Sequence, residues 1–463
     1  MTCHGHLMTL KTVLSRLLSR PNDLENAERR HYDRYRNAFW TIASNIASRA
    51  AALALTLLSV RWTLPYLGTE RFGAWMTITA FASILGLADF GISNSLTNRV
   101  AQVAASGNGD ALRSTISKGL ALLCLIGLTL SASLPILASH VAWTALIHLH
   151  GTNEESEITR TAQIFGILFG ISIVGNGTTR IFAGLQRGFE AHIASLAASL
   201  ASIPCLAYAT TSHADIPTLI LCTMGITQLG HLSLLARLWA SGHFSPFKMS
   251  GALSEAAHFL ETAWVFLLIQ IGLVVASGSD SLILAHAQGP AAVTQYMVTL
   301  RITQIFSQPL AIINAPLWGA YADAKARGDK EFIRITFRRS LHFTLAGSSL
   351  GAALLIMAGG FSIREWTHDS TLISLPLIAT MSIWLITESC GNSIGVLLNG
   401  LGLLRMQLLL ILTYIAIALP AKLFGASSFG PTGMMLAGVM SYVLVFGLGY
   451  GLAYRETITT SMR

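Results

Sequence analysis

The stretch TISKGLALLCLIGLTLSASLPIL, residues 115–137, decides the fold class of this chain because it is long, apolar and almost free of charge. As a helix it would rise about 34 Å at roughly 1.5 Å per residue. The hydrocarbon core of a bilayer is about 30 Å thick. The stretch therefore predicts a transmembrane helix, with Lys118 near one end.

The rest of the chain repeats this pattern. Of its 463 residues, 52% are hydrophobic and 11% are charged, and the mean hydropathy is +0.58. Soluble domains carry about 25% charged residues, so we expect an all-α polytopic membrane protein. Twelve candidate spans are present, near residues 39–60, 71–97, 115–137, 161–184, 191–210, 216–238, 261–287, 292–320, 339–360, 371–398, 404–424 and 431–452.

The basic residues predict the orientation. If the N-terminus is cytoplasmic, 23 of the 30 Lys and Arg residues fall in inner segments or at inner span ends, as the positive-inside rule requires. Both termini are then cytoplasmic, and the net charge of +8 reflects topology rather than nucleic-acid binding. The expected units are a cytoplasmic segment 1–38, a first lobe 39–240, an inter-lobe loop 241–260, a second lobe 261–453 and a tail 454–463.

The chain shows no sign of enzymatic chemistry. No Lys follows a Gly, which excludes a P-loop, and neither HExxH nor CxxC occurs. The outer loop at 138–160 is too short for a catalytic domain. Its acidic and histidine residues are more typical of a solvated loop than of a metal site; they are His148, His150, Glu154, Glu155 and Glu157. We expect no enzyme activity, no cofactor and no metal.

The sequence also contains an internal repeat. Residues 68–113 align with 289–334 at a shift of 221 without gaps, with identities that include Gly68/Gly289, Met76/Met297 and Gly107/Gly328. Residues 175–185 align with 391–401 at a shift of 216, which pairs Asn176 with Asn392. Each half has six spans, so the halves are parallel repeats. Transporters built this way bind substrate where the repeats meet.

Four stretches resemble the polysaccharide and O-antigen flippases (Wzx-type), whose superfamily includes the multidrug and toxic-compound extruders. They are YLGTERFGAWMTI (66–78), LADFGISNSLTNRVAQ (87–102), SDSLILAHAQGPAAVTQYMVTLRI (279–302) and LWGAYADAKARGDKEFIRITFRRS (317–340).

The resemblance implies an extruder-like fold with a V-shaped central cavity, in the bacterial inner membrane. It implies a flippase for undecaprenyl-pyrophosphate-linked oligosaccharide, working by alternating access and coupled to an ion. Expected partners are that lipid, membrane lipids, a polysaccharide polymerase and a chain-length regulator. The alternatives are a multidrug extruder or, with less support, a polytopic glycosyltransferase or polymerase.

Charged residues within spans are costly and call for a reason. Arg49 and Arg301 fall near the midplane, one in each half, and either hold the anionic head group or pair with a carboxylate. Asp89, Asp280 and Glu388 either bind a coupling ion or balance these arginines.

Polar residues at equivalent places in the repeat are further candidates. Asn176 and Asn392 either bind sugar hydroxyls or hydrogen-bond between helices. Arg180, with Arg187, is a further candidate for the pyrophosphate at the inner mouth.

Overall fold

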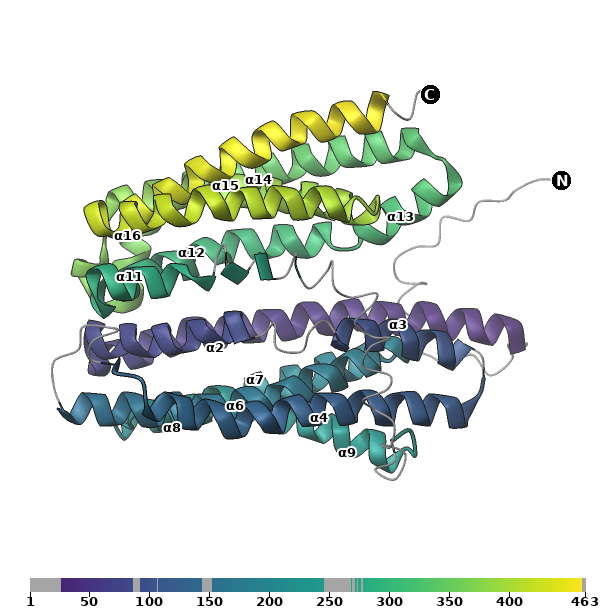
Figure 1. Cartoon of the computed structure of the whole chain (residues 1–463), viewed down its shortest axis with the longest axis horizontal. Helices are drawn as coiled ribbons and strands as arrows, with labels where there is room; N and C mark the ends of the chain where they lie inside the picture. The colour runs from purple at the N-terminus through teal and green to yellow at the C-terminus, as the bar shows by residue number, and fades with distance from the viewer. Residues whose placement is uncertain are drawn as a thin grey trace.

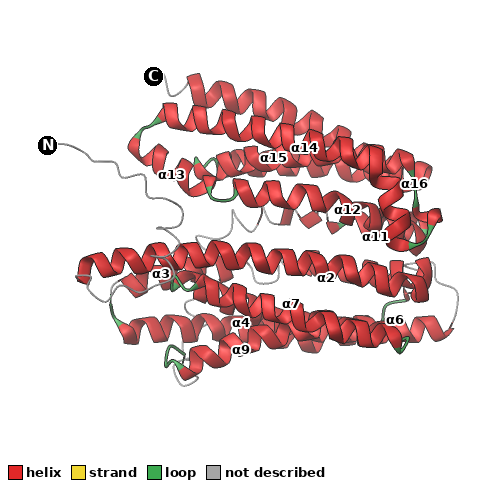
Figure 2. Ribbon diagram, turned by 180° about the vertical axis from the view of Figure 1, so that it is seen from behind, coloured by secondary structure: helices red, strands yellow, loops and turns green. Residues whose placement is uncertain are grey.

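The chain is helical throughout the part that the computed structural model describes (Figure 2). The described residues are 26–85, 92–105, 107–143, 152–244, 268, 271–272, 274–275 and 278–459. Within them no strand occurs. The helices are α2 (Asn26–Leu85), α3 (Ile92–Ala105), α4 (Gly109–Ser139), α6 (Thr152–Gly184), α7 (Gly188–Thr211), α8 (Ile216–Ile220), η1 (Leu221–Gly225), α9 (Ile226–Ala240), α11 (Asp280–Gln288), α12 (Pro290–Asn314), α13 (Leu317–Arg327), α14 (Lys330–Thr367), η3 (Ser370–Leu372), α15 (Leu375–Gly400) and α16 (Leu404–Thr459).

Eight helices in the described residues are long and apolar enough to cross a membrane. Two of these, α2 and α16, each contain two spans. An unbroken α2 of 60 residues would be about 90 Å long. Gly68 (φ 74°) breaks α2 and Gly430 (φ 62°) breaks α16, and in Figure 1 the chain turns back in each helix. The seventh of the twelve expected spans, near 261–287, lies partly outside the described residues.

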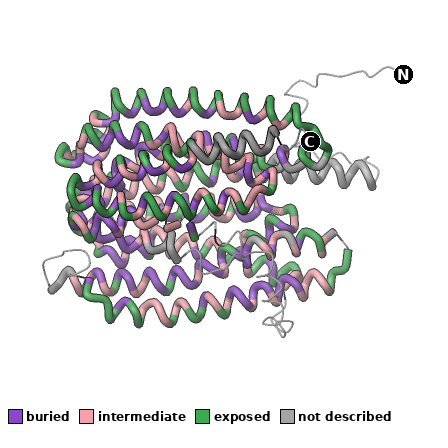
Figure 3. Tube along the Cα trace, turned by 45° about the horizontal axis from the view of Figure 1, so that its top comes forward, coloured by how far each residue is buried: buried purple, intermediate pink, exposed green. Residues whose placement is uncertain are grey.

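The surface is that of a membrane protein. Large apolar side chains are exposed along the outer faces of the helices, among them Leu128, Met357 and Phe429, each more than 70% exposed. Figure 3 shows exposed and buried positions alternating along the long helices. A soluble protein rarely exposes apolar patches of this extent, so we conclude that the chain is a multi-pass membrane protein.

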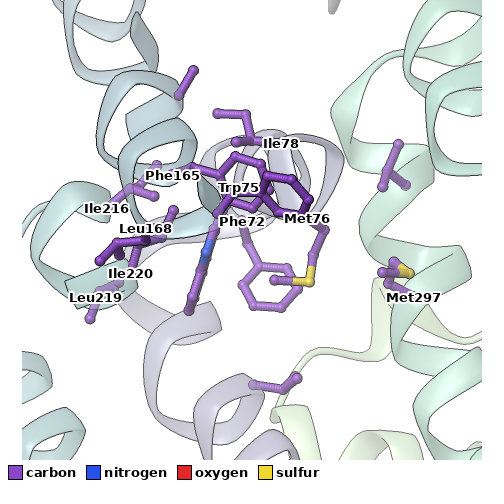
Figure 4. Packing of buried hydrophobic residues seen from close by; sticks show 14 of the residues in the cluster. Phe72, Trp75, Met76, Ile78, Phe165, Leu168, Ile216, Leu219, Ile220 and Met297 are labelled. Atoms are coloured by element: carbon purple, nitrogen blue, oxygen red, sulfur yellow. The ribbon is translucent and has the colours of Figure 1, made fainter. Parts of the chain in front are cut away.

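The helices form two bundles (Figure 1). We call α2–α9 the N-terminal bundle and α11–α16 the C-terminal bundle. One core of buried apolar residues runs through both. In Figure 4, Met76 on α2 and Met297 on α12, an identical pair in the repeat, lie on the facing sides of the two bundles. The expected inter-lobe loop falls largely within residues 245–267, outside the described residues.

The backbone repeats as the sequence does. Gly68 (φ 74°, ψ 172°) and Gly289 (φ 80°, ψ 176°) have nearly the same conformation, which only glycine adopts readily. At the other end, Gly107 and Gly328 both have positive φ and each precedes the N-cap of a long helix.

The N-caps match as well. The Asn108 side chain accepts from Ala111 N at 3.0 Å, and the equivalent Asp329 side chain accepts from Phe332 N at 2.9 Å. Such caps satisfy amide groups that the first helical turn leaves unpaired. The duplication is therefore present in turns and caps as well as in helix number.

Before the first span, the backbone of α2 begins at Asn26. The last part of the expected cytoplasmic segment is thus a helical extension of the first span. Residues 1–25 lie outside the described residues.

Candidate functional site

The two bundles meet where α2 and α12 begin again after their glycine breaks. The Thr294 hydroxyl donates to the Thr69 carbonyl at 2.6 Å. Gly73 packs directly against the carbonyl of Pro290, with no room for a side chain. The repeat shift of 221 carries Thr69 onto Pro290 and Gly73 onto Thr294. The two contacts are therefore exchanged by a pseudo-two-fold axis that passes between them.

Further hydrogen bonds join the bundles near this point. Arg61 donates to the Glu365 carbonyl at 2.9 Å, and the Trp366 indole donates to the Leu57 carbonyl at 2.9 Å. We call the surface where the bundles meet the junction. Its residues are Leu57, Arg61, Thr69, Gly73, Pro290, Thr294, Glu365 and Trp366. Each of its hydrogen bonds joins a side chain to a backbone carbonyl, so either bundle can part from the other without breaking a helix.

Arg49 and Arg301 have no acidic partner in the described part of the chain. Arg49 is exposed, donates to the Asn45 side chain one turn earlier at 2.9 Å, and lies within electrostatic reach of His192 on α7. Arg301 is largely buried in the C-terminal bundle and donates to the Gln304 side chain at 3.1 Å. Asp280 is therefore not the partner of either arginine in this conformation.

Asp280 has a different partner, Lys422 on α16. The Lys422 ammonium lies 2.7 Å from Asp280, and both side chains are about 5% exposed. Tyr296 also donates to the Asp280 carboxylate, at 3.0 Å, and Lys422 lies over the Tyr414 ring. This network joins α11, α12 and α16. A buried charge with such partners is neutralised within the bundle.

Glu388 differs from Asp280 because its side chain is exposed. The Trp384 indole, one turn earlier on α15, donates to it. Trp384 packs edge-on against Tyr442, which stacks on Phe446. Glu388 is therefore an accessible carboxylate beside an aromatic cluster. Asp89, the third predicted ion-coupling residue, lies outside the described residues.

Asn176 and Asn392 are both exposed. No described residue hydrogen-bonds to either side chain, so the structure gives no support to the alternative that they join helices. Arg180 is exposed one turn after Asn176 on α6. The three side chains are available to a ligand, which is what a substrate-binding role requires.

Arg187 is already engaged. It pairs with Glu190 at 2.5 Å, and Arg237 from α9 pairs with the same carboxylate at 2.8 Å. Glu190 is buried, so this cluster fastens α7 to α9. An open hollow of about 520 Å³ lies nearby between residues 107–113 and 241–243, and it includes none of the predicted site residues.

Sequence reasoning missed a second buried network. The Asn314 amide on α12 donates to Thr344 on α14 and to Ser393 on α15, and its oxygen accepts from Ser340. An asparagine inside an apolar span was the available signal. Its partners were not predictable, because they come from two other helices.

Comparison with known proteins identifies the family. A model described as "Polysaccharide biosynthesis protein" matches residues 35–317, more than half of the chain. The chain belongs to this family. No curated protein matches the sequence closely enough to be counted.

Solved structures show the fold of this family member. An inward-facing MATE-family multidrug resistance transporter of the MOP superfamily matches with a TM-score of 0.73 and 15% identity, over 90% of this chain and 99% of that one. An outward-facing one matches with a TM-score of 0.70 and 14% identity, over 93% and 97%. A MOP transporter from Pyrococcus furiosus, described as having reversed polarity in its binding pocket, matches with a TM-score of 0.66 and 15% identity, over 93% and 97%. The chain therefore has the MOP transporter fold.

Proposed function

We propose that this family member is a flippase that moves undecaprenyl-pyrophosphate-linked oligosaccharide across the bacterial inner membrane without chemically altering it. The observation that carries the proposal is a pair of arginines, one in each bundle, that lack acidic partners in the described part of the chain. A guanidinium offers a planar fork of donors that matches phosphate oxygens. Membership in a polysaccharide biosynthesis family supports a glycan attached to that anion.

The exposed asparagines have side chains that are suited to bind the glycan. Asn176 and Arg180 lie one turn apart on α6, and Asn392 holds the equivalent place on α15. An amide can donate to and accept from sugar hydroxyls. In this proposal the arginines bind the pyrophosphate and the asparagines bind the first sugars.

The junction supplies a gate for alternating access. With both termini cytoplasmic, the junction lies on the periplasmic side, so the conformation described here is closed to the periplasm. Rocking of the two bundles against each other, about an axis in the membrane plane, would break the Thr294–Thr69 and Trp366–Leu57 hydrogen bonds and open that side. Rocking of repeats against each other is the usual mode in such transporters.

Glu388 is the carboxylate best placed to exchange a coupling ion, because it is exposed. Asp280 would take part only in a conformation that separates it from Lys422. Asp89 remains a third candidate on the sequence evidence.

The rival is a multidrug extruder, which the fold accommodates equally well. Unpaired arginines disfavour a cationic drug as substrate because like charges repel. A glycosyltransferase or polymerase has less support, since the sequence contains none of the catalytic motifs sought.

Deletion of the gene tests the proposal in cells. We expect the undecaprenyl-linked oligosaccharide to accumulate facing the cytoplasm, and the wild-type chain to relieve this. Unchanged lipid-linked oligosaccharide together with new sensitivity to cationic drugs would favour the extruder.

Labelling tests the orientation. In a cysteine-free background and intact cells, an impermeant thiol reagent should label Glu70→Cys at the junction and leave Glu331→Cys unlabelled. The reverse pattern would overturn the proposed topology.

A further inference from the structure

Two cysteines in the N-terminal bundle lie closer together than free thiols normally do. The Sγ atoms of Cys205 on α7 and Cys222 on η1 are 2.8 Å apart. Non-bonded heavy atoms rest at about 3.5–4.0 Å even when they are carbon, and sulfur is larger. A disulfide bond is about 2.05 Å long. A movement of less than 1 Å therefore separates this pair from a covalent bond.

The local backbone brings the two residues together. They lie six residues on either side of the turn between Thr211 and Ile216, so they sit at matching depths on adjacent helices. Cys222 belongs to the π-helical turn Leu221–Gly225. Such turns are rare and are frequent at functional sites. Ordinary packing of small side chains does not require one.

The two thiols differ in access. Cys222 is 6% exposed, whereas Cys205 is only partly buried. Cys205 therefore keeps an exposed surface through which the pair could be reached, while Cys222 is enclosed behind it. This is the arrangement of an attacking and a resolving cysteine.

The depth is compatible with oxidation. Six helical residues correspond to about 9 Å from the turn. In the orientation proposed above, the turn faces the periplasm, where disulfides persist. The inference uses that orientation but does not depend on the transported substrate.

We propose that Cys205 and Cys222 form a reversible disulfide, so that the N-terminal bundle has a redox-sensitive modification site. The oxidant is a disulfide of general form RSSR. The Cys205 thiolate attacks one sulfur and releases RS⁻. The Cys222 thiolate then attacks the Cys205 sulfur of the mixed disulfide and releases the second RS⁻. The two released thiolates take up the two cysteine protons, so two thiols are oxidised and one disulfide is reduced.

The bond would tie α7 to the turn that begins the last crossing of the bundle. α7 packs extensively against α2, which carries the N-terminal side of the junction. Oxidation would therefore stiffen the bundle that carries Gly73 and Thr69. It would leave the C-terminal bundle unchanged.

Differential alkylation of the full-length protein tests the proposal. Membranes are acid-quenched and denatured, free thiols are blocked with N-ethylmaleimide, disulfides are reduced, and new thiols receive an isotopically heavy maleimide. Mass spectrometry should find heavy label on Cys205 and Cys222 in most molecules. Cys124 and Cys390, free thiols of intermediate exposure, are internal controls and should carry light label.

A second measurement covers a preparation that is isolated in the reduced state. The purified protein is incubated with oxidised glutathione before the same labelling. Conversion of both residues to heavy label, reversed by dithiothreitol, supports the proposal. Light label on both residues after this treatment would overturn it.

Single variants establish the pairing. In Cys205→Ser, Cys222 should carry only light label, and in Cys222→Ser the same should hold for Cys205. Heavy label that persists on either partner in these variants would show a different pairing and contradict the proposal.

Discussion

The N-terminal and C-terminal bundles share their turns but bury different charges. Gly68 and Gly107 have counterparts of the same conformation in Gly289 and Gly328. The shift of 221 places Ser59 opposite Asp280, and the shift of 216 places Leu206 opposite Lys422. Pro204 and Pro420 coincide at the latter shift, which supports the alignment. The duplicated backbone is thus retained, while the Asp280–Lys422 ion pair has no counterpart at the equivalent Ser59 and Leu206.

This difference teaches that charge in the membrane is not needed for the fold. Leu206 is fully buried where the other bundle has a lysine. Removing two charges from water is costly, and apolar residues often replace such pairs without loss of stability. The pair in the C-terminal bundle therefore calls for a functional reason, and the ion coupling proposed above would supply one.

The largest effect is expected from Lys422→Met. It leaves the Asp280 carboxylate buried without its cation, which typically costs about 3–5 kcal/mol. Thermal unfolding of the purified protein in detergent should show a large drop in midpoint or a failure to insert. The matched control is Leu206→Met, for which a volume-conserving change should cost less than about 1.5 kcal/mol.

The double variant Asp280→Asn with Lys422→Met sharpens the same comparison. It should recover most of the stability without recovering ion-coupled transport. Recovery of both would mean that the pair is purely structural.

The second effect concerns the arginines, again one in each bundle. Arg49→Ala and Arg301→Ala should each lower flippase activity at least about tenfold, since a lost charged hydrogen bond costs about 1.5–3 kcal/mol. Lysine variants keep the charge but lose the planar fork, so they should retain partial activity. The measurement is complementation of a flippase-null strain, normalised to inserted protein. Full complementation by both alanine variants would contradict the proposal that these arginines bind the anionic head group.

The third effect lies at the junction, where Gly73 and Thr294 are equivalent. A methyl group at Gly73 would collide with the Pro290 carbonyl, so Gly73→Ala should drive the junction apart. Thr294→Val removes one hydrogen bond, a loss of about 1 kcal/mol, and should act more weakly. Spin labels at Glu70 and Ser370, in a background without native cysteines, would report this as a longer distance population. An unchanged distance in Gly73→Ala would refute the gate.

The smallest effect compares Gln186 (φ 58°) with its counterpart Gly402 (φ 66°). A left-handed conformation costs most residues about 1–2 kcal/mol. Gln186→Gly should therefore be neutral or slightly stabilising, whereas Gly402→Gln should destabilise by about 1 kcal/mol. Midpoints of thermal unfolding measure both. Equal changes in the unfolding midpoint for the two variants would contradict the shared left-handed conformation of the two turns.

The sequence predicted the features that depend on local pattern. Apolar length predicted the spans, and the identities between the two halves predicted a duplication. It did not predict the partner of Asp280, because the burial of Lys422 depends on the rotation of α16 against α11. The Asn314 network was missed for the same reason. Exposure at Asn176 and Asn392 is likewise a property of packing, and the repeat indicated only that the two positions are equivalent.

Transport by the purified protein in proteoliposomes tests the central claim most directly. A fluorescent undecaprenyl-pyrophosphate-linked oligosaccharide is incorporated, and a membrane-impermeant glycosidase reports the fraction that is accessible from outside. The wild-type chain should make the protected fraction accessible within the assay, and the double variant Arg49→Ala with Arg301→Ala should leave it protected. A protected fraction that stays unchanged with correctly folded wild-type protein, while a cationic drug is transported, would contradict the account.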